Sequence, residues 1–370
     1  MLAGEFSTST GCKKPYAPPI VTSTLNYLVV EAVINSGADS TLIRLSRTVN
    51  VASKVGSKPE LHAIVTVEND QQASYALQET SNGFYGLPSL TLDTTRKYRL
   101  RIKTADGKEY LSAFVEVKNA PPLDTLGYKI KDDGVYVYIN THDTNNQTHF
   151  YRWDYDETWL FHSHFESYLK YVNGQFIFRN TNEQIYTCWG NDHASSIILT
   201  STNNLSQDKI NEQPIAYVAS NSEKLESRYT IIVREYAMTR AGYDYYTNIK
   251  KNTEELGKIF DAQPSELKGN ITCITDPSVP VIGFVSAGSI SSKRIFIDNR
   301  DLPAWQAYTY YDMIDCQYDL VKVSSEADYQ QFYGGDNPPF LPTSGPGSAA
   351  ATECTDCTLR GTNKQPGFWK

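Results

Sequence analysis

The sequence predicts a mainly β protein of two domains, and three observations support this prediction. Short runs of β-branched and aromatic residues, each bounded by turn residues, recur from residue 28 onward. Tyr is abundant, at 26 residues, whereas Met is scarce, at 3, which suits strands and wet loops better than packed helices. The length of 370 residues corresponds to about two domains and is sufficient for two buried cores.

Charge and hydropathy limit the partners that we expect. Lys and Arg number 34 against 42 Asp and Glu, which gives a formal net charge of −8. No basic run is long enough to follow a phosphate backbone, so we expect no nucleic-acid partner. No stretch of about 18 apolar residues occurs, so we expect no helix that spans a bilayer. Any membrane attachment would therefore be covalent.

Residues 1–19 are interpreted as the remnant of an export signal followed by a tether. Their first part, MLAGEFSTSTG, lacks the basic and apolar regions of a working secretory signal. Ser-Thr-Gly-Cys followed by two lysines resembles the end of a bacterial lipobox, where a small residue precedes the acylated cysteine. Cys12 is therefore the candidate lipid anchor, and an ordinary thiol is the alternative. Three prolines in residues 13–19 predict an extended tether.

Residues 20–120 are predicted to form a β-sandwich. The segment Tyr98–Lys103 alternates apolar and basic side chains, as expected of a strand with one buried face. Pro121 and Pro122 cannot continue a central strand, so we place the domain boundary near residue 120. The predicted strands of this domain are residues 28–34, 41–47, 63–67, 73–77, 98–103 and 110–117.

Residues 121–310 are predicted to form a larger β-rich domain with one α-helix. The helix is expected near residues 241–257, because apolar and small residues recur there at helical spacing and Gly257 is a stop signal. Residues 311–370 contain several prolines, four of which lie close to Ser344. Because prolines interrupt regular structure, we expect an irregular tail packed on this domain. The predicted strands are residues 127–139, 150–171, 175–178, 185–189, 196–199, 215–219, 229–238, 281–287 and 294–297.

Several segments in order resemble one family, the Bacteroidota outer-membrane lipoproteins described as the domain of unknown function 4249. The most specific segments are Lys251–Gly257, Phe260–Pro264, Gly269–Ile271, Pro280–Ser286 and the C-terminal GTNKQPGFW. The resemblance implies export with lipidation at Cys12, and an immunoglobulin-like or carboxypeptidase-regulatory-like sandwich before a larger β-rich domain. It also implies proximity to a TonB-dependent outer-membrane receptor. No acidic pair follows Cys12, so the periplasmic and cell-surface faces of the membrane both stay open.

The six cysteines limit the disulfides that can form. With Cys12 as an anchor, five cysteines remain, which allows at most two bridges and one leftover thiol. We expect Cys316 to pair with Cys354 or Cys357 and so to staple the proline-rich tail. The spacing Cys354-x-x-Cys357 is also that of half a zinc or redox site. The remaining candidates for a bridge are Cys188 and Cys273.

The sequence predicts no catalytic residue, metal or cofactor. We find no Gly-x-Ser-x-Gly elbow, no His-Glu-x-x-His helix and no phosphate-binding glycine loop. His162 and His164 share one face of a predicted strand and could form a zinc pair, although an exposed strand face is the simpler interpretation. Asp154, Asp156 and Glu157 could mimic a glycosidase pair, although such neighbours are common in β proteins.

Aromatic residues of the second domain are the candidate recognition surface. They could stack on sugar rings or anchor a protein interface, and the alternative is that they form the core. The candidates are Trp153, Tyr155, Trp159, Trp189, Tyr243 and Tyr246. We expect a non-enzymatic accessory protein that binds a nutrient, peptide or glycan, or docks beside a TonB-dependent transporter. A structural or adhesion module is the second hypothesis, and a hydrolase is the third.

Overall fold

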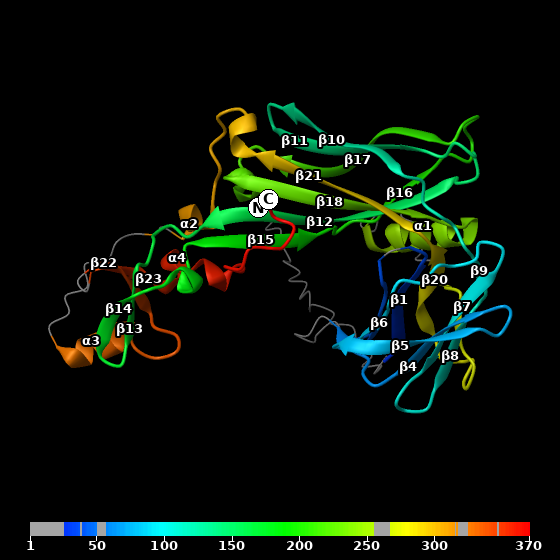
Figure 1. Ribbon diagram of the computed structural model, residues 1–370, viewed down its shortest axis with the longest axis horizontal. Coiled ribbons are helices and arrows are strands. Elements are labelled where there is room, and N and C mark those ends of the chain that lie inside the picture. The colour runs from blue at the N-terminus through cyan, green and yellow to red at the C-terminus, as the bar shows by residue number, and fades with distance from the viewer. Residues whose placement is uncertain are drawn as a thin grey trace, which may run out of the picture.

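The structure is a computed structural model that describes residues 26–37, 39–49, 57–254, 267–314, 316, 325–345 and 348–370. The predicted mainly β class is confirmed. Figure 1 shows two β bodies that adjoin each other and an arm that extends away from them. Cys12, the tether of residues 13–19 and the expected helix stop at Gly257 lie outside the described residues.

The first body is one sheet that curls around a single core. Its strands follow the order β19-β8-β7-β4-β5-β6-β2-β1-β20, with β3 on β2 and β9 on β7. Beside β9, a bridge between Val117 and Ala287 brings that part of the sheet against β20. The bounds are β1 (Leu28–Asn35), β2 (Thr41–Arg47), β3 (Lys58–Pro59), β4 (Ile64–Asn69), β5 (Ser74–Ser81), β6 (Phe84–Leu87), β7 (Lys97–Lys103), β8 (Glu109–Ser112), β9 (Val115–Glu116), β19 (Ile271–Cys273) and β20 (Val281–Gly288).

Residues 271–288 belong to this first body. The ranges predicted from the sequence had placed them in the second domain. Strand β20 runs parallel to β1 over eight residue pairs, from Leu28 with Val281 to Asn35 with Gly288. The sequence placed residues 281–287 and 294–297 together as a final pair of strands. A parallel partner far along the chain leaves no local turn signal, so the pattern could not identify it.

The segments around Gly269 and Gly283, which carried the family resemblance, close this body. The Asn270 side chain donates to the Val285 carbonyl and accepts from the Val285 N–H, both at 2.8 Å. Gly283 has a φ of +145°, and a Cβ there would lie 2.3 Å from the Val30 carbonyl oxygen. Only glycine fits so close an approach of two backbones, so these residues serve the fold.

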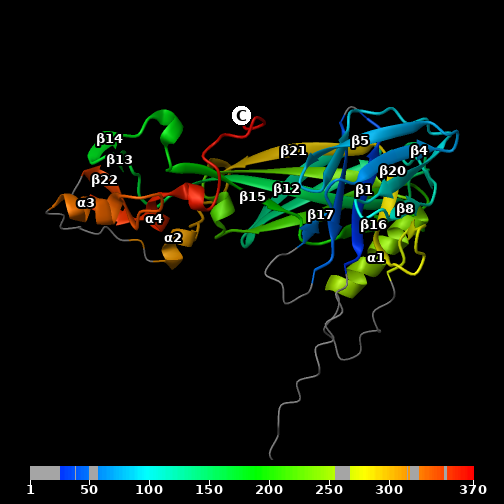
Figure 2. The ribbon, with the colours of Figure 1, turned by 90° about the horizontal axis from the view of Figure 1, so that it is seen from below.

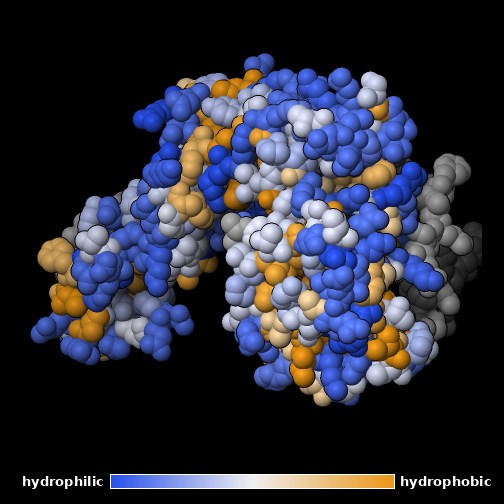
Figure 3. All heavy atoms as spheres, turned by 45° about the vertical axis from the view of Figure 1, so that its right-hand side comes forward, coloured by the Kyte–Doolittle hydropathy of each residue, from blue (hydrophilic) through white to orange (hydrophobic). Residues whose placement is uncertain are grey.

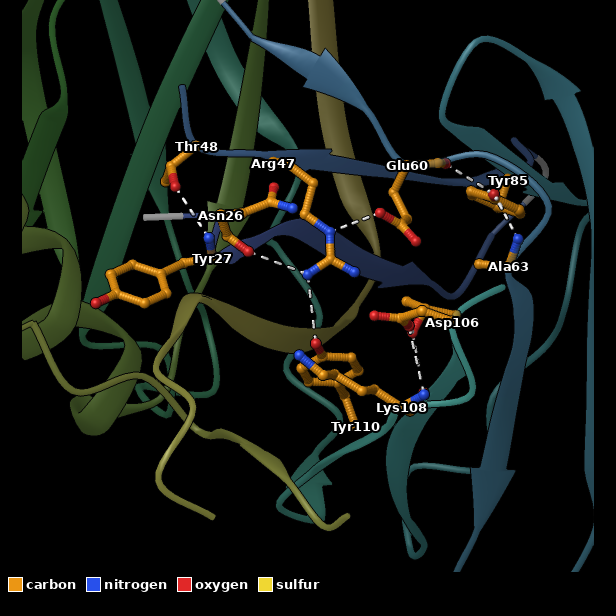
Figure 4. Close-up of polar contacts among 11 residues, drawn as sticks. Asn26, Tyr27, Arg47, Thr48, Glu60, Ala63, Tyr85, Asp106, Lys108 and Tyr110 are labelled. Atoms are coloured by element: carbon orange, nitrogen blue, oxygen red, sulfur yellow. Dashed lines mark hydrogen bonds and ion pairs between the residues drawn. The ribbon is translucent and has the colours of Figure 1, made fainter. Parts of the chain in front are cut away.

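A buried ion pair fixes the chain where the described residues begin (Figure 4). Arg47 Nε donates to Glu60 Oε2 at 2.6 Å, and Arg47 Nη1 donates to the Asn26 carbonyl at 3.3 Å and to the Tyr110 hydroxyl at 3.4 Å. Both charged side chains are nearly buried. The guanidinium therefore joins the ends of β2 and β8 to the chain just before β1.

The second body is a sandwich of two sheets. Strands β10, β11 and β17 form one sheet, and the other has the order β15-β12-β18-β21 with β16 also on β12. Alternate residues such as Val135, Val137, Tyr229 and Ile231 from the two sheets meet in one core. The bounds are β10 (Leu123–Lys131), β11 (Gly134–His142), β12 (Phe150–His162), β15 (Thr187–His193), β16 (Ile198–Ser201), β17 (Lys209–Ala219), β18 (Arg228–Ala237) and β21 (Ile290–Asp298).

Helix α1 (Arg240–Glu254) lies where a helix was expected and adjoins both bodies. The Tyr245 ring lies 5.4 Å from the ring of Phe284, which belongs to β20 of the first body. A Cβ on Gly242 would lie 3.2 Å from the same Phe284 ring, so the small residue permits this close contact. Figure 2, seen from below, places α1 beside β16 and the first body.

The tail is more regular than we expected from its sequence. The tail contains α2 (Tyr310–Met313), α3 (Glu326–Tyr333), α4 (Thr352–Thr355), and a hairpin of β22 (Phe340–Gly345) and β23 (Ser348–Ala351). Ser325 and Asp328 form a capping box at the start of α3, and Thr309 and Asp312 form another at α2. These caps stabilise short helices whose apolar periodicity is too brief to recognise from sequence.

The tail and an inserted hairpin together build what we call the distal arm. The hairpin consists of β13 (Leu169–Val172) and β14 (Gln175–Phe178), and it packs against β22 and α3. Helix α4 packs in turn on β22 and β23. Figures 1 and 2 both show this arm at one end of the molecule, away from the first body. The distal arm is therefore defined as residues 167–179 together with the described residues from 325 to 356.

Candidate functional site

The six aromatic candidates do not form one exposed surface. Trp153 is buried in the core of the second body, where its Nε1 donates to Glu235 Oε2 at 2.9 Å. Tyr155 and Trp159 are partly buried against the same core, and Trp189 is buried. Tyr243 lies against Phe150 near α1, with ring centroids 5.1 Å apart. The core interpretation therefore accounts for most of this cluster.

The remaining aromatic contacts also serve packing. The Trp159 indole packs closely on Gly190. A Cβ on Gly190 would lie 2.5 Å from the indole ring, so a glycine is needed at this position. Trp189 meets Trp369 of the C-terminal segment, with centroids 6.1 Å apart. The Arg152 guanidinium lies 4.9 Å from the centre of the Tyr246 ring. These contacts hold edges and helices in place.

The carboxylates that could mimic a glycosidase pair are each joined to a base. Arg234 donates to Asp154 at 2.6 Å and to Asp156 at 2.5 Å, on the outer face of β12. Glu157 is buried and accepts from Lys224 Nζ and from the Tyr229 hydroxyl, both at 2.5 Å. Partnered carboxylates on two faces of one strand do not form a catalytic pair that flanks a substrate.

A second polar group lies inside the sandwich. Glu235 is fully buried and accepts from the Thr141 hydroxyl at 3.1 Å and from Trp153 Nε1 at 2.9 Å. Burial raises the pKa of Glu235 to about 7. Asp208 lies in the same core and accepts from Tyr151 and Thr202 hydroxyls at 2.7 and 2.6 Å. Satisfied hydrogen bonds make this network a structural one.

The cysteines form two bridges. Cys188 pairs with Cys357, and Cys316 pairs with Cys354, which is one of the two pairings expected for Cys316. Cys273 is a free, buried thiol in the first body. Cys354 and Cys357 are therefore both committed to disulfides. One ties the C-terminal segment to β15, and the other ties α4 to Cys316 within the tail.

The predicted histidine pair borders a polar cleft, which we call the Glu226 cleft. It has a volume of about 460 Å³ and lies at the end of β12. The His162 ring packs on Tyr186 at 4.9 Å between centroids, and the His164 ring lies 6.4 Å from that of Tyr311. The residues that line the cleft are His162, Ser163, His164, Tyr186, Glu226, Asn299, Trp305, Ala307, Thr309, Tyr311 and Asp312.

Glu226 is the residue of this cleft that the sequence did not single out. It follows a short 3₁₀ helix, η2 (Glu223–Leu225), and burial together with the charges of Glu223 and Asp312 raises its pKa to about 7. Its Oε1 lies 4.0 Å from His162 Nδ1, and burial lowers the pKa of His162. The spacing of residues in the sequence does not predict a role for Glu226, because the cleft is formed by four segments that are distant along the chain.

The described residues contain neither a cluster of metal-binding side chains nor a membrane-spanning helix. Within them, no three His, Cys, Asp or Glu side chains are grouped so as to hold a metal ion. None of the helices in the described part of the chain is long and apolar enough to cross a membrane.

The distal arm carries an exposed apolar surface on both faces of its hairpin, which we call the arm tip. Phe178 is 81% exposed, Tyr168 is 52% exposed, and Val172 and Ile177 are each 41% exposed. Figure 3 shows hydrophobic residues gathered on the arm, apart from the two bodies. Beneath this surface, Tyr171, Phe176, Tyr329 and Tyr333 pack ring against ring. The exposed side chains therefore stand on a packed support.

Comparison with known proteins gives one match. The family described as "Domain of unknown function (DUF4249)" matches residues 13–294, which is more than half of the chain. No curated protein matches the chain. The match includes both bodies and the segments that close the first one, and it ends before the distal arm's second part.

Proposed function

The chain belongs to the DUF4249 family, and on this premise we propose that it is a non-enzymatic accessory protein of the outer membrane. In this proposal it is held by a lipid on Cys12 and docks onto a TonB-dependent transporter. The two β bodies are scaffold, and the distal arm carries the docking surface. Capture or presentation of a nutrient, peptide or glycan belongs to the complex of both proteins.

The observation that carries this proposal is the arm tip. Large apolar side chains scattered singly on a surface are ordinary, whereas several on one projecting element are typical of a protein interface. Phe178, at 81% exposed, has the geometry of an anchor that a partner's pocket would enclose. The extended position of the arm leaves this side chain accessible to a large partner (Figure 1).

The support beneath the arm tip favours a preformed interface. The Ser167 hydroxyl donates to the Pro342 carbonyl at 2.6 Å, and the Phe165 N–H donates to the Cys354 carbonyl at 3.0 Å. Cys354 is in turn bridged to Cys316. A surface that is already rigid loses less entropy when it binds, so small contact areas suffice for affinity.

Affinity purification from gently solubilised outer membranes tests this proposal. We expect the full-length, natively exported protein to carry a lipid on Cys12 and to co-purify with a TonB-dependent barrel, as identified by mass spectrometry. The double variant Phe178→Ser with Ile177→Ser should lose the barrel, because it removes two apolar contacts of the arm tip.

The matched control is Leu42→Ser, which removes an apolar side chain that is 52% exposed on the first body. This variant should retain the barrel. If the acylated protein purifies without any transporter, or if the arm-tip variant retains it fully, the docking proposal fails. The structural or adhesion hypothesis would then be the better explanation.

A further inference from the structure

The Glu226 cleft contains a carboxylate that lacks a cationic partner. Its Oε2 is buried and has no hydrogen-bond donor among the residues that the structure describes. The side chain as a whole is nevertheless 30% exposed, so a molecule in the cleft can reach the carboxylate through its other atoms. A carboxylate that is short of donors is stabilised by a ligand that brings a positive charge beside it.

The bases around Glu226 do not neutralise it. Arg360 is committed to Glu223, with its two terminal nitrogens 2.9 and 2.5 Å from the two carboxylate oxygens. His162 lies 4.0 Å away, and because burial lowers its pKa, it is largely uncharged at neutral pH. The charged and titratable groups that act on Glu226 or border the cleft with it are Glu223, Asp312, Arg360, His162, His164, Tyr186 and Tyr311.

The second carboxylate of the cleft is already occupied by the protein. Asp312 Oδ2 accepts from the Thr309 N–H at 2.7 Å and from the Thr309 hydroxyl at 2.8 Å, as the cap of α2. Asp312 therefore adds negative charge to the cleft without needing a ligand. Glu226 is left as the group that a bound cation would pair with directly.

The walls of the cleft also favour a cation. Tyr186, Trp305 and Tyr311 line it, and aromatic faces attract ammonium and guanidinium groups. The volume of about 460 Å³ lies within the range of small-molecule sites. A carboxylate beside aromatic rings is a recognised arrangement for an amine or guanidine.

We propose that the Glu226 cleft binds a small molecule through a protonated amino or guanidinium group, with Glu226 as its counter-ion. The ligand's cation occupies the space between Glu226 and the aromatic walls. It pairs with the exposed part of the Glu226 carboxylate and offsets the negative charge of Asp312. This inference does not depend on the docking proposal, because the cleft and the arm tip are separate surfaces.

Proton linkage follows from the same geometry. Because the pKa of Glu226 is raised to about 7, part of its population is protonated at neutral pH when no ligand is bound. A cation pairs only with the ionised form, so binding displaces a proton. Affinity should therefore rise about tenfold between about pH 6 and about pH 8, and calorimetry in buffers of different ionisation enthalpy should detect proton release.

Isothermal titration calorimetry of the full chain with arginine, putrescine and 1,4-butanediol tests the proposal. Butanediol matches putrescine in length but carries no cationic group, so it should not bind, whereas arginine or putrescine should. Glu226→Gln should abolish binding and should not unfold the protein, since it removes an uncompensated charge. Glu212→Gln removes an exposed carboxylate of β17 that does not line the cleft, and it should leave affinity unchanged.

Three results would overturn the proposal. The first is binding of 1,4-butanediol as tight as that of putrescine, which would show that charge is not recognised. The second is full affinity in a folded Glu226→Gln variant, with thermal unfolding used to verify its fold. The third is the absence of binding by both cations at millimolar concentration near about pH 8, where Glu226 is ionised.

Discussion

At the scale of single residues, several side chains that look functional by type are structural by position. Trp153 and Glu235 meet inside the sandwich, and Arg234 pairs with Asp154 and Asp156 on its outside. The sequence identified the aromatic richness of β12 correctly, but alternation along one strand does not say which face meets a second sheet. Whether a Trp recognises a ligand or fills a core is decided by its partners across the sheet.

Replacement of Arg47 should reveal the cost of leaving Glu60 buried without its partner. Arg47→Ala should lower the free energy of unfolding by about 3 to 5 kcal/mol, because one charge of a buried pair stays behind. Urea denaturation followed by Trp fluorescence measures this loss. Arg47→Met combined with Glu60→Met should be much less destabilising, and equal losses in both variants would contradict an isolated-charge explanation.

Glu235 should make stability depend on pH in a defined direction. Burial raises its folded-state pKa to about 7, above the ordinary value of 4.5 for a glutamate, so the folded protein retains a proton that the unfolded chain releases. This contribution is fully present below about pH 4.5 and is lost as pH rises through about 7. Glu235→Gln keeps an oxygen for the Trp153 N–H and cannot ionise.

Glu235→Gln should therefore stabilise the protein by about 1 to 3 kcal/mol near pH 8 and by much less near pH 5. Thermal unfolding of variant and wild type across this pH range measures the difference. A gain that is the same at both pH values would show that the effect comes from packing and not from ionisation.

At the scale of elements, the sequence located most strands but not their partners. Tyr98, Leu100 and Ile102 of β7 face the core as their alternation predicted. By contrast, β20 pairs in parallel with β1, and nothing local distinguishes it from a strand of the second body. The short helices of the tail depend on capping boxes and on a disulfide, which a periodicity search does not detect.

Asn270 should be essential for closing the first body. Asn270→Ala removes both hydrogen bonds to Val285 and should lower the free energy of unfolding by about 2 kcal/mol or more. Hydrogen exchange should show the loss of protection concentrated in β19 and β20. Asn203→Ala, at an exposed turn residue, is the control and should change stability little. Equal effects would contradict the closing role.

The two disulfides should differ in their contribution. Cys188 and Cys357 are separated by 169 residues, and Cys316 and Cys354 by 38 residues. Since a longer closed loop restricts the unfolded chain more, loss of the first bridge should cost about 1 kcal/mol more than loss of the second. Denaturation of the paired Cys→Ser variants measures both losses, and the reverse order would contradict this explanation.

At the scale of the whole molecule, the chain combines two β bodies with a stapled arm. The mainly β class followed from turn residues and composition. The arm did not, because it is assembled from residues 167–179 and from the tail, which lie far apart in sequence. Contacts of that kind are set by tertiary packing, and so are the Glu226 cleft and the arm tip.

Photo-crosslinking in living cells tests the central claim of docking through the arm most directly. A photoreactive residue at position 178 of the arm tip should crosslink to a TonB-dependent barrel. The same residue at position 42 should not, although the Leu42 side chain is also exposed, at 52%, on the first body. Crosslinks to the barrel from position 42 alone, or none from position 178 in protein that is correctly exported, would contradict the proposal.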